Sequence, residues 1–161
     1  MKKCVNNNIL IPEMADLLRE GKEVRFTPTG VSMRPFIEGG KDVVVLRKLP
    51  AVRVGDIALA ELHLPAPNLQ PPTAQRSNVS FVLHRVIAVK DEAVTLMGDG
   101  NIGSTEHCTT ADVLGTVIRI ENAHGRRKPI TRGRLWYHIR PCRRILLKIY
   151  RKSGKILGFL G

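Results

Sequence analysis

The amino-acid sequence predicts a mainly β protein, with a minor α+β character, formed as a single domain. Between residues 24 and 121, short runs of apolar and β-branched residues recur between turn-forming residues, which is typical of antiparallel sheets. A helical pattern precedes these runs only once, near the N-terminus. The 161 residues, 43% of them hydrophobic, are enough for one domain with a substantial core.

The first expected element is a helix over Pro12–Gly21. Pro12 suits the first turn of a helix, and Gly21 suits its C-terminal end. Met14, Leu17 and Leu18 can then face the core.

The expected strands share an apolar, β-branched composition and are bounded by turn-forming residues. They cover Val24–Thr27, Asp42–Arg47, Ile57–Leu62, Phe81–Val89, Ala93–Met97 and Val113–Glu121. Leu64–Ser80 contains four prolines and is therefore expected to be a long exposed loop. Gly98–Ala111 is also predicted to be a loop.

The charges divide the chain into a neutral part and a basic C-terminal extension. Residues 1–125 hold 14 Lys/Arg and 14 Asp/Glu, whereas residues 126–161 hold 12 Lys/Arg and no acid. Apolar residues at helical spacing alternate with Arg and Lys over residues 132–161, which predicts a basic amphipathic C-terminal helix. Such a helix can bind an anionic membrane surface or pack on the domain. Nucleic acid is a less favoured partner, because the extension has no recognised motif and no interleaved aromatic residues.

Several classes of protein are disfavoured by the sequence. No run approaches the roughly 20 apolar residues of a membrane span, and the N-terminus lacks the apolar region of a signal peptide. Cys4, Cys108 and Cys142 are scattered, which fits a reducing compartment. We therefore expect a cytoplasmic protein that can bind peripherally to a membrane. No His/Cys spacing resembles a zinc site, and neither a metal nor a cofactor is expected.

Ser32 is the first candidate for catalysis. It lies in the segment Thr29–Pro35, where Gly30 permits a tight turn and Pro35 ends regular structure. Its hydroxyl can point outward there, and the backbone N–H groups at Ser32 and Met33 could form an oxyanion hole. A serine in such a turn is more often structural, so the interpretation needs a partner.

His84, on the strand Phe81–Val89, is the candidate partner. An imidazole is suited to take the proton of a serine hydroxyl near neutral pH, and a carboxylate usually holds the ring in place. Asp99 and Glu106 lie in the predicted loop after the next strand, and either could orient His84. Taken alone, a strand histidine is usually a surface or core residue, and an aspartate after glycine usually makes a turn.

Taken in order, six short motifs resemble those of type I signal peptidases and their relatives, which include the self-cleaving repressors of the SOS response. The motifs cover Gly30–Pro35, Lys41–Val45, Gly55–Ile57, His84–Ile87, Gly98–Asn101 and Val113–Val117. The resemblance spans roughly Thr27 to Ile120 and is closest to small bacterial proteins of this superfamily without a membrane span.

This resemblance implies a function and a set of site residues. His84-Arg85-Val86 is similar to the serine–histidine branch, found in endoplasmic-reticulum and archaeal enzymes, rather than to the serine–lysine branch. By resemblance Ser32 is the nucleophile and His84 the general base, and Asp99 matches the aspartate of the Gly-Asp motif. A further acid follows in that branch, and Glu106 is the nearest candidate. The expected activity is cleavage of an extended peptide or protein substrate with small residues beside the cut.

Two other functions are compatible with the same fold. A catalytically inert binding or accessory protein would keep the fold without the chemistry, and labelling by a serine-directed probe distinguishes it. A repressor-like regulator would bind DNA through residues 126–161, but no helix-turn-helix precedes Thr27 and histidine replaces the lysine. Salt-dependent DNA binding would support the regulator.

Overall fold

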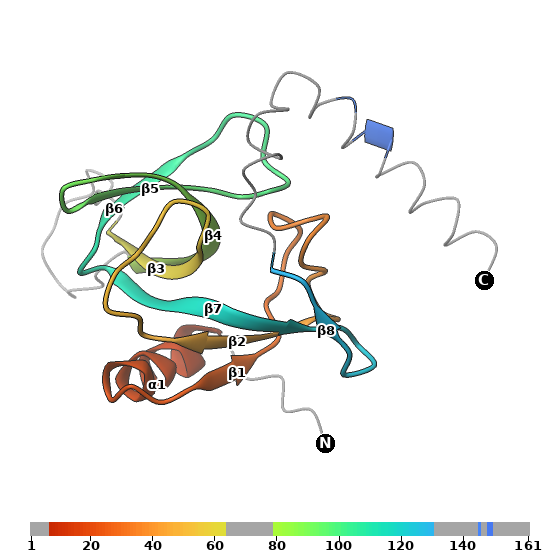
Figure 1. The fold of residues 1–161 in the computed structure, drawn as a ribbon, viewed down its shortest axis with the longest axis horizontal. Helices are drawn as coiled ribbons and strands as arrows, with labels where there is room; N and C mark the ends of the chain where they lie inside the picture. The colour runs from red at the N-terminus through yellow and green to blue at the C-terminus, as the bar shows by residue number, and fades with distance from the viewer. Residues whose placement is uncertain (1–6, 64–78, 131–144, 146–147, 150–161) are drawn as a thin grey trace, which may run out of the picture.

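One antiparallel sheet of eight strands, with a helix packed against it, forms the part of the chain that the structure describes (Figure 1). The structure is a computed structural model, and it describes residues 7–63, 79–130, 145 and 148–149. The prediction of a mainly β protein with one N-terminal helix is confirmed. The expected C-terminal helix and most of the expected proline-rich loop fall outside the described residues.

The strands run in the order β1-β2-β7-β3-β4-β5-β6 across the sheet, and β8 pairs with β7. Their bounds are β1 Val24–Phe26, β2 Val43–Arg47, β3 Ile57–His63, β4 Val79–Lys90, β5 Ala93–Met97, β6 Glu106–Thr109, β7 Val113–Glu121 and β8 Arg127–Lys128. Strand β6 also lies against β3, so β3 to β6 curl into a small barrel-like layer.

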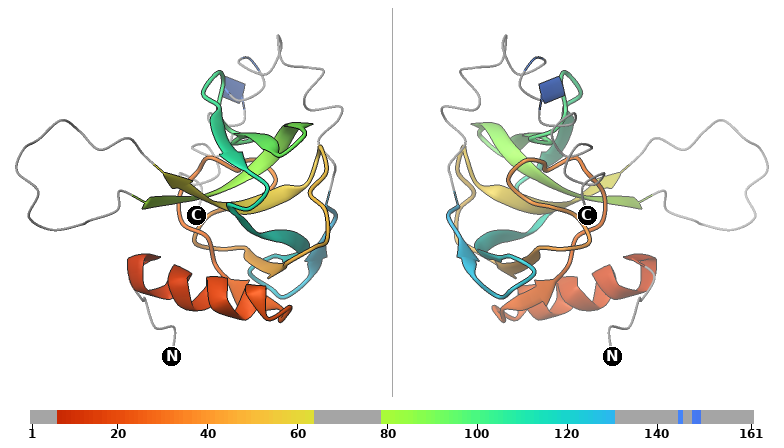
Figure 2. Two further views of the ribbon diagram at one scale, coloured as in Figure 1. Left: turned by 90° about the vertical axis from the view of Figure 1, so that its left-hand side faces the viewer. Right: turned by 90° about the vertical axis from the view of Figure 1, so that its right-hand side faces the viewer.

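Helix α1, Asn7–Arg19, lies beneath the sheet beside β1 and β7 (Figure 2). It begins five residues before Pro12, so the proline does not mark its first turn as expected; Pro12 removes only one backbone hydrogen bond near the helix start. Met14 and Leu18 are buried as predicted, but Leu17 is exposed. The helix ends at Arg19, two residues before the expected end at Gly21, and the N–H of Gly21 donates to the carbonyl of Leu18 at 3.0 Å.

Strands β6 and β8 were not predicted. Strand β6 lies inside the expected loop Gly98–Ala111, and its residues Glu106–Thr109 pair with β5. The sequence of β6 shows no alternation of apolar and polar residues, because one of the two side chains that turn inward, Glu106, is charged; the other is Cys108. Strand β8 extends the sheet beyond Gly125, and the amine of Lys128 contacts the buried Asp42 carboxylate at 2.7 Å.

Two apolar clusters fill the fold on opposite sides of the central strands. The larger cluster packs α1 against β1, β2, β3 and β7, and the smaller one fills the layer formed by β3 to β6. Alternate residues of β3 contribute to both clusters, with Ile57 and Leu59 in the larger and Ala58 and Ala60 in the smaller. The packing on both faces of β3 holds its neighbour β4, which carries His84.

Strand β4 changes partner along its length. Its first half pairs with β3 from Val79 to Arg85, and its second half pairs with β5 from Arg85 to Lys90. Among the described strands, residues 79–84 are therefore paired on one edge only. The other edge of this half faces the segment that contains Ser32.

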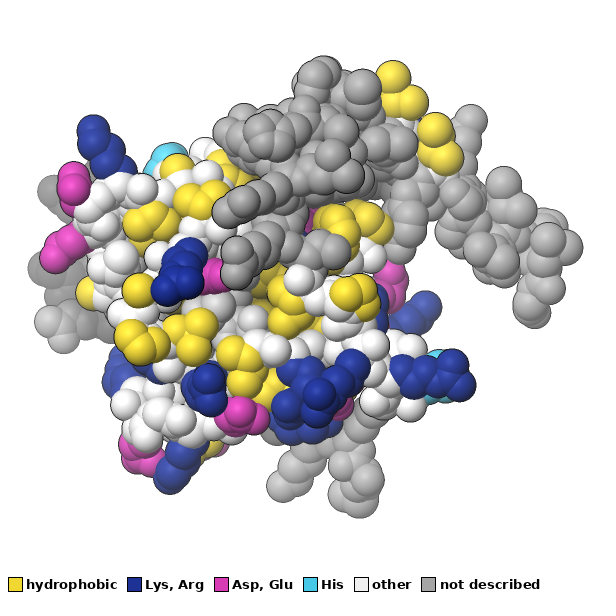
Figure 3. All heavy atoms as spheres, in the orientation of Figure 1, with side chains coloured by type: hydrophobic (Ala, Val, Ile, Leu, Met, Phe, Trp, Pro, Cys, Tyr) yellow, Lys and Arg dark blue, Asp and Glu magenta, His cyan; other side chains and the backbone are white. Residues whose placement is uncertain are grey.

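Charged side chains over β1, β2 and β7 pair with one another. Glu121 contacts Arg25 and Arg119, and Glu23 contacts Arg47 and Arg119. In Figure 3, basic and acidic groups accordingly lie together along the lower edge of the molecule. No helix in the described part of the chain is long and apolar enough to cross a membrane.

Cys108 turns toward the smaller apolar cluster, which determines its reactivity. Burial, together with the nearby charge of Asp112, raises the pKa of the Cys108 thiol to about 11. In a variant with Cys4 and Cys142 replaced by serine, we expect Cys108 to react at pH 7 roughly 100-fold more slowly with a thiol reagent than an exposed cysteine. The reaction rate of Cys108 should rise steadily toward pH 11. Unfolding in urea should make Cys108 react as fast as an exposed cysteine. Equal rates in the folded and unfolded chain would contradict this prediction.

Candidate active site

The segment that carries Ser32 forms two consecutive turns between β1 and β2. The N–H of Arg34 donates to the carbonyl of Val31 at 3.2 Å, and the N–H of Ile37 donates to the carbonyl of Met33 at 3.0 Å. Gly30 adopts a φ of 93°, a conformation that favours glycine, as its place in the motif predicted. The Arg34–Pro35 peptide bond is cis. These turns bring the Ser32 hydroxyl to the surface that faces β4.

Ser32, His84 and Glu106 form a chain of two hydrogen bonds. The Oγ of Ser32 lies 2.9 Å from Nε2 of His84, and Nδ1 of the same ring lies 2.9 Å from Oε2 of Glu106. The three residues come from the turn before β2, from β4 and from the start of β6. The His84 side chain is 7% exposed, so the ring is largely shielded from water. The distance between hydroxyl and ring is within the reach that a nucleophile and its base require.

The neighbours of the His84 ring determine where its proton lies. An ionised carboxylate only accepts hydrogen bonds, so Nδ1 donates to Glu106. In the neutral imidazole Nε2 then has the free lone pair and can accept the hydrogen bond of the Ser32 hydroxyl. This tautomer is the one in which a histidine can remove a proton from serine.

Asp99, the other candidate acid, lies against Arg85. Its two carboxylate oxygens accept hydrogen bonds from Nε and Nη2 of Arg85 at 2.8 and 2.7 Å. Both side chains are buried, and Nη1 of Arg85 donates to the carbonyl of Gly55 at 2.8 Å. The sequence did not decide which of the two acids orients His84, and in the structure it is Glu106 that contacts the ring. Asp99 instead binds Arg85, which also binds Gly55, so this pair connects the motifs Gly55–Ile57, His84–Ile87 and Gly98–Asn101.

The loop Gly98–Asn101 supports Ser32 from behind through the main chain. The N–H of Gly100 donates to the Ser32 carbonyl at 2.6 Å. A Cβ atom at Gly98 would lie 2.7 Å from the same carbonyl oxygen, which is closer than real Cβ contacts. Glycine at these positions thus lets the two backbones approach, and the Asp99–Arg85 pair anchors the loop.

Adding a methyl group at Gly98 should therefore destabilise the protein. We expect Gly98→Ala to lower the free energy of unfolding by about 1–3 kcal/mol, because the Ser32 backbone must shift. Gly103→Ala is the matched control: its Cβ would meet nothing within 4 Å, so a change within about 0.5 kcal/mol is expected. Urea unfolding measures both, and equal midpoints for the two variants would show that the close approach is unimportant.

The predicted oxyanion donors are available. Within the part of the chain that the structure describes, neither the N–H of Ser32 nor that of Met33 donates a hydrogen bond. Both residues line the cleft in which the Ser32 hydroxyl lies. Two such donors next to a serine hydroxyl suit the stabilisation of a developing negative charge on a carbonyl oxygen.

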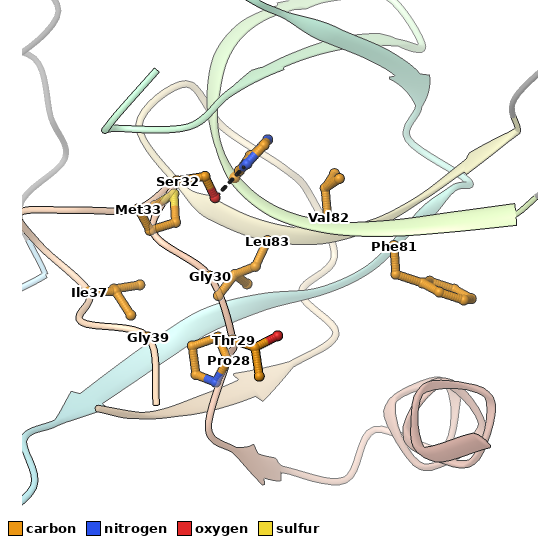
Figure 4. A pocket seen from close by; sticks show the side chains of 11 residues that line it. Pro28, Thr29, Gly30, Ser32, Met33, Ile37, Gly39, Phe81, Val82 and Leu83 are labelled. Carbon is orange, nitrogen blue, oxygen red and sulfur yellow. Dashed lines mark hydrogen bonds between the residues drawn. The ribbon is translucent and has the colours of Figure 1, made fainter. Parts of the chain in front are cut away.

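The cleft lies between the Ser32 segment and the first half of β4 (Figure 4). Its volume is about 140 Å³. Gly30, Met33 and Ile37 form one wall, and Leu83 and His84 form the other. Phe81 lies farther along β4, away from the serine. An extended segment of chain placed in this cleft would run beside the unpaired edge of β4.

Sequence reasoning missed the part that Arg85 plays. It treated Arg85 only as a member of the His-Arg-Val motif, although its guanidinium contacts Gly55 and Asp99 and lies 5.4 Å from the centre of the Phe36 ring. The order of the motifs was the one available signal, because the contacts of Arg85 join it to residues 14 to 49 positions away in the chain. Among the described residues, no group of three or more His, Cys, Asp or Glu side chains could hold a metal ion.

Comparisons of the chain with models of known protein families and with the curated proteins found no match.

Proposed function

We propose that this protein is a serine peptidase of the signal-peptidase-like superfamily, with Ser32 as nucleophile, His84 as general base and Glu106 as the acid that orients the base. The observation that carries the proposal is the pair of 2.9 Å hydrogen bonds from Ser32 to His84 and from His84 to Glu106. A serine–histidine peptidase requires this arrangement, and the order of the sequence motifs is that of such a family.

The reaction proceeds through an acyl-enzyme. The Ser32 Oγ attacks a peptide carbonyl carbon while Nε2 of His84 takes the hydroxyl proton, and the N–H groups of Ser32 and Met33 bind the oxyanion. The C–N bond then breaks as His84 returns the proton to the leaving amine. Water next attacks the ester, transferring a proton to His84, and Ser32 is released with its hydroxyl restored. Glu106 stabilises the imidazolium at each proton transfer.

The substrate is a peptide bound in extended conformation. Its backbone adds to the unpaired edge of residues 79–84 in β4, where main-chain groups can pair with it as an extra strand. The cleft of about 140 Å³ favours small side chains beside the cut. Contact of residues 132–161 with an anionic membrane surface is a second part of the proposal, supported by the sequence alone.

A fluorophosphonate probe tests the mechanism directly. We expect the folded protein to be labelled at Ser32, as located by peptide mass spectrometry, because only an activated serine reacts quickly. Ser32→Ala should abolish labelling, and His84→Ala should slow it by orders of magnitude. Ser104→Ala, in an exposed loop, is the control and should label normally. Failure of the folded wild-type protein to react, or labelling of Ser32 that does not depend on His84, would favour an inert binding protein instead.

A further inference from the structure

A second and larger cavity lies away from the cleft that contains Ser32. Its volume is about 430 Å³, within the range of small-molecule sites. Three connections surround it: the one after β2, the β4–β5 turn and the β6–β7 turn. Its apolar lining consists of Leu49, Pro50, Ala51, Val52, Val89, Ala111 and Val113, of which Pro50, Ala51 and Ala111 are exposed at its rim. Three of these residues, Val52, Val89 and Val113, belong to or pack against the smaller apolar cluster, so the cavity reaches toward that core.

Thr116 places a buried hydroxyl in this cavity. The residue is 3% exposed and lines the cavity from β7. No hydrogen bond joins its hydroxyl to another residue that the structure describes. The hydroxyl is not fully enclosed, because among the described residues the fully enclosed side-chain polar atom without a partner is Nε of Arg34. A hydroxyl that faces the cavity can be hydrogen-bonded by water or by a bound ligand.

Lys48 supplies a positive charge at the same cavity. Its amine donates to the carbonyl of Val113, which itself lines the cavity. An ammonium group has three donors, and this is the one hydrogen bond found for it in the described part of the chain. Burial, with a smaller contribution from the charge of Arg19, lowers the pKa of Lys48. A bound anion would favour the charged form of Lys48 and so oppose the effects of burial and of Arg19. Asp91 also lines the cavity, so an anionic group belongs at the Lys48 end.

The cavity is separated from the catalytic residues by one strand. Thr116 is paired with Ala58 of β3, and Ala58 is paired with His84 of β4. Directly paired residues point to the same face of a sheet, and neighbouring strands are about 4.8 Å apart. Thr116 and His84 thus lie on one face, about 10 Å apart, with the small side chain of Ala58 between them. A ligand here would not occupy the cleft.

We propose that this cavity is a binding site for a small aliphatic carboxylate, such as a medium-chain fatty acid. The alkyl chain occupies the apolar lining, the carboxylate binds the Lys48 amine, and the Thr116 hydroxyl donates a hydrogen bond to a carboxylate oxygen. The site is independent of the proposed peptidase activity.

Titration of the full-length, ¹⁵N-labelled protein with decanoate tests the site. We expect saturable chemical-shift changes concentrated at residues 48–52, 89–91 and 110–116, and an increase in Tm. Decanol and decylamine, which have the same chain without the anion, should bind at least about tenfold more weakly. Ser32→Ala should bind decanoate like the wild type. Absence of decanoate binding, equal binding of decylamine, or shifts centred on the Ser32 cleft would each overturn the proposal.

Two variants test the polar contacts. Lys48→Met keeps the length of the side chain but removes the charge, and it should weaken decanoate binding at least about tenfold. Lys41→Met, an exposed lysine outside the cavity, is its control and should have no effect. Thr116→Val should weaken binding about fivefold and leave Tm nearly unchanged, because the hydroxyl has no hydrogen bond to a described residue that could be lost. Unchanged affinity in Lys48→Met, or a clear fall in Tm in Thr116→Val, would show that these groups do not serve a ligand.

Discussion

Replacing Glu106 with glutamine is expected to slow acylation of Ser32 by about 10³–10⁴-fold without unfolding the protein. The carboxylate accepts a hydrogen bond from Nδ1 of His84 at 2.9 Å and so keeps the lone pair on Nε2. An amide can donate to Nδ1 instead, which moves the proton to Nε2 and leaves no base for Ser32. The second-order rate constant for a fluorophosphonate or an activated ester measures the effect, and circular dichroism checks the fold.

Glu92→Gln is the matched control for this experiment. Glu92 is exposed in the turn between β4 and β5, and its substitution removes the same charge without touching the ring. Its rate should equal that of the wild type. Glu106→Asp keeps the acid but shortens its reach, so an intermediate rate is expected. A Glu106→Gln variant that acylates as fast as Glu92→Gln would exclude Glu106 from the mechanism.

The largest effect on stability is expected from Asp99→Ala. This change leaves the guanidinium of Arg85, which is 3% exposed, without its carboxylate, and a buried charge without its counterion costs about 3–5 kcal/mol. Asp16→Ala breaks an ion pair with Arg19 whose side chains are 73% and 62% exposed, and it should cost at most about 1 kcal/mol. Urea unfolding at constant pH compares the two variants.

A double substitution separates charge from packing. Arg85→Met combined with Asp99→Leu replaces both charges by apolar groups, so no buried charge is left unpaired and much of the lost stability should return. If Asp99→Ala destabilised the protein no more than Asp16→Ala, the pair would not anchor the loop Gly98–Asn101.

The sequence predicted those strands whose own residues are mostly apolar and β-branched. Residues 93–97 and 113–121 are apolar and β-branched, and their bounds agree with the structure. Strand β6 has the sequence Glu-His-Cys-Thr and depends on pairing with β5, which a local pattern cannot reveal. Missing β6 also hid the position of Glu106, because a strand determines which side of the sheet a side chain faces.

Candidate site residues were easier to find than their contacts. Ser32 and His84 followed from the motifs, and their side chains lie 2.9 Å apart. The choice between Asp99 and Glu106 depended on which acid reaches the ring across the fold, and Arg85 binds one of them. Nothing near Thr116 or Lys48 marks a cavity in the sequence, since its lining comes from connections up to 68 residues apart.

The support of Ser32 from behind has a consequence for which of its neighbours can be changed. The carbonyl of Ser32 accepts a hydrogen bond from the N–H of Gly100, and the side chain of Met33, directly after the serine, is buried in the larger apolar cluster. Val31, immediately before the serine, is 56% exposed. Substitutions at Val31 therefore change the surface beside Ser32 while the buried side chain of Met33 and the Gly100 hydrogen bond keep the serine in place. If the proposed peptidase function holds, Val31 is the position at which substrate preference can be changed without displacing the serine.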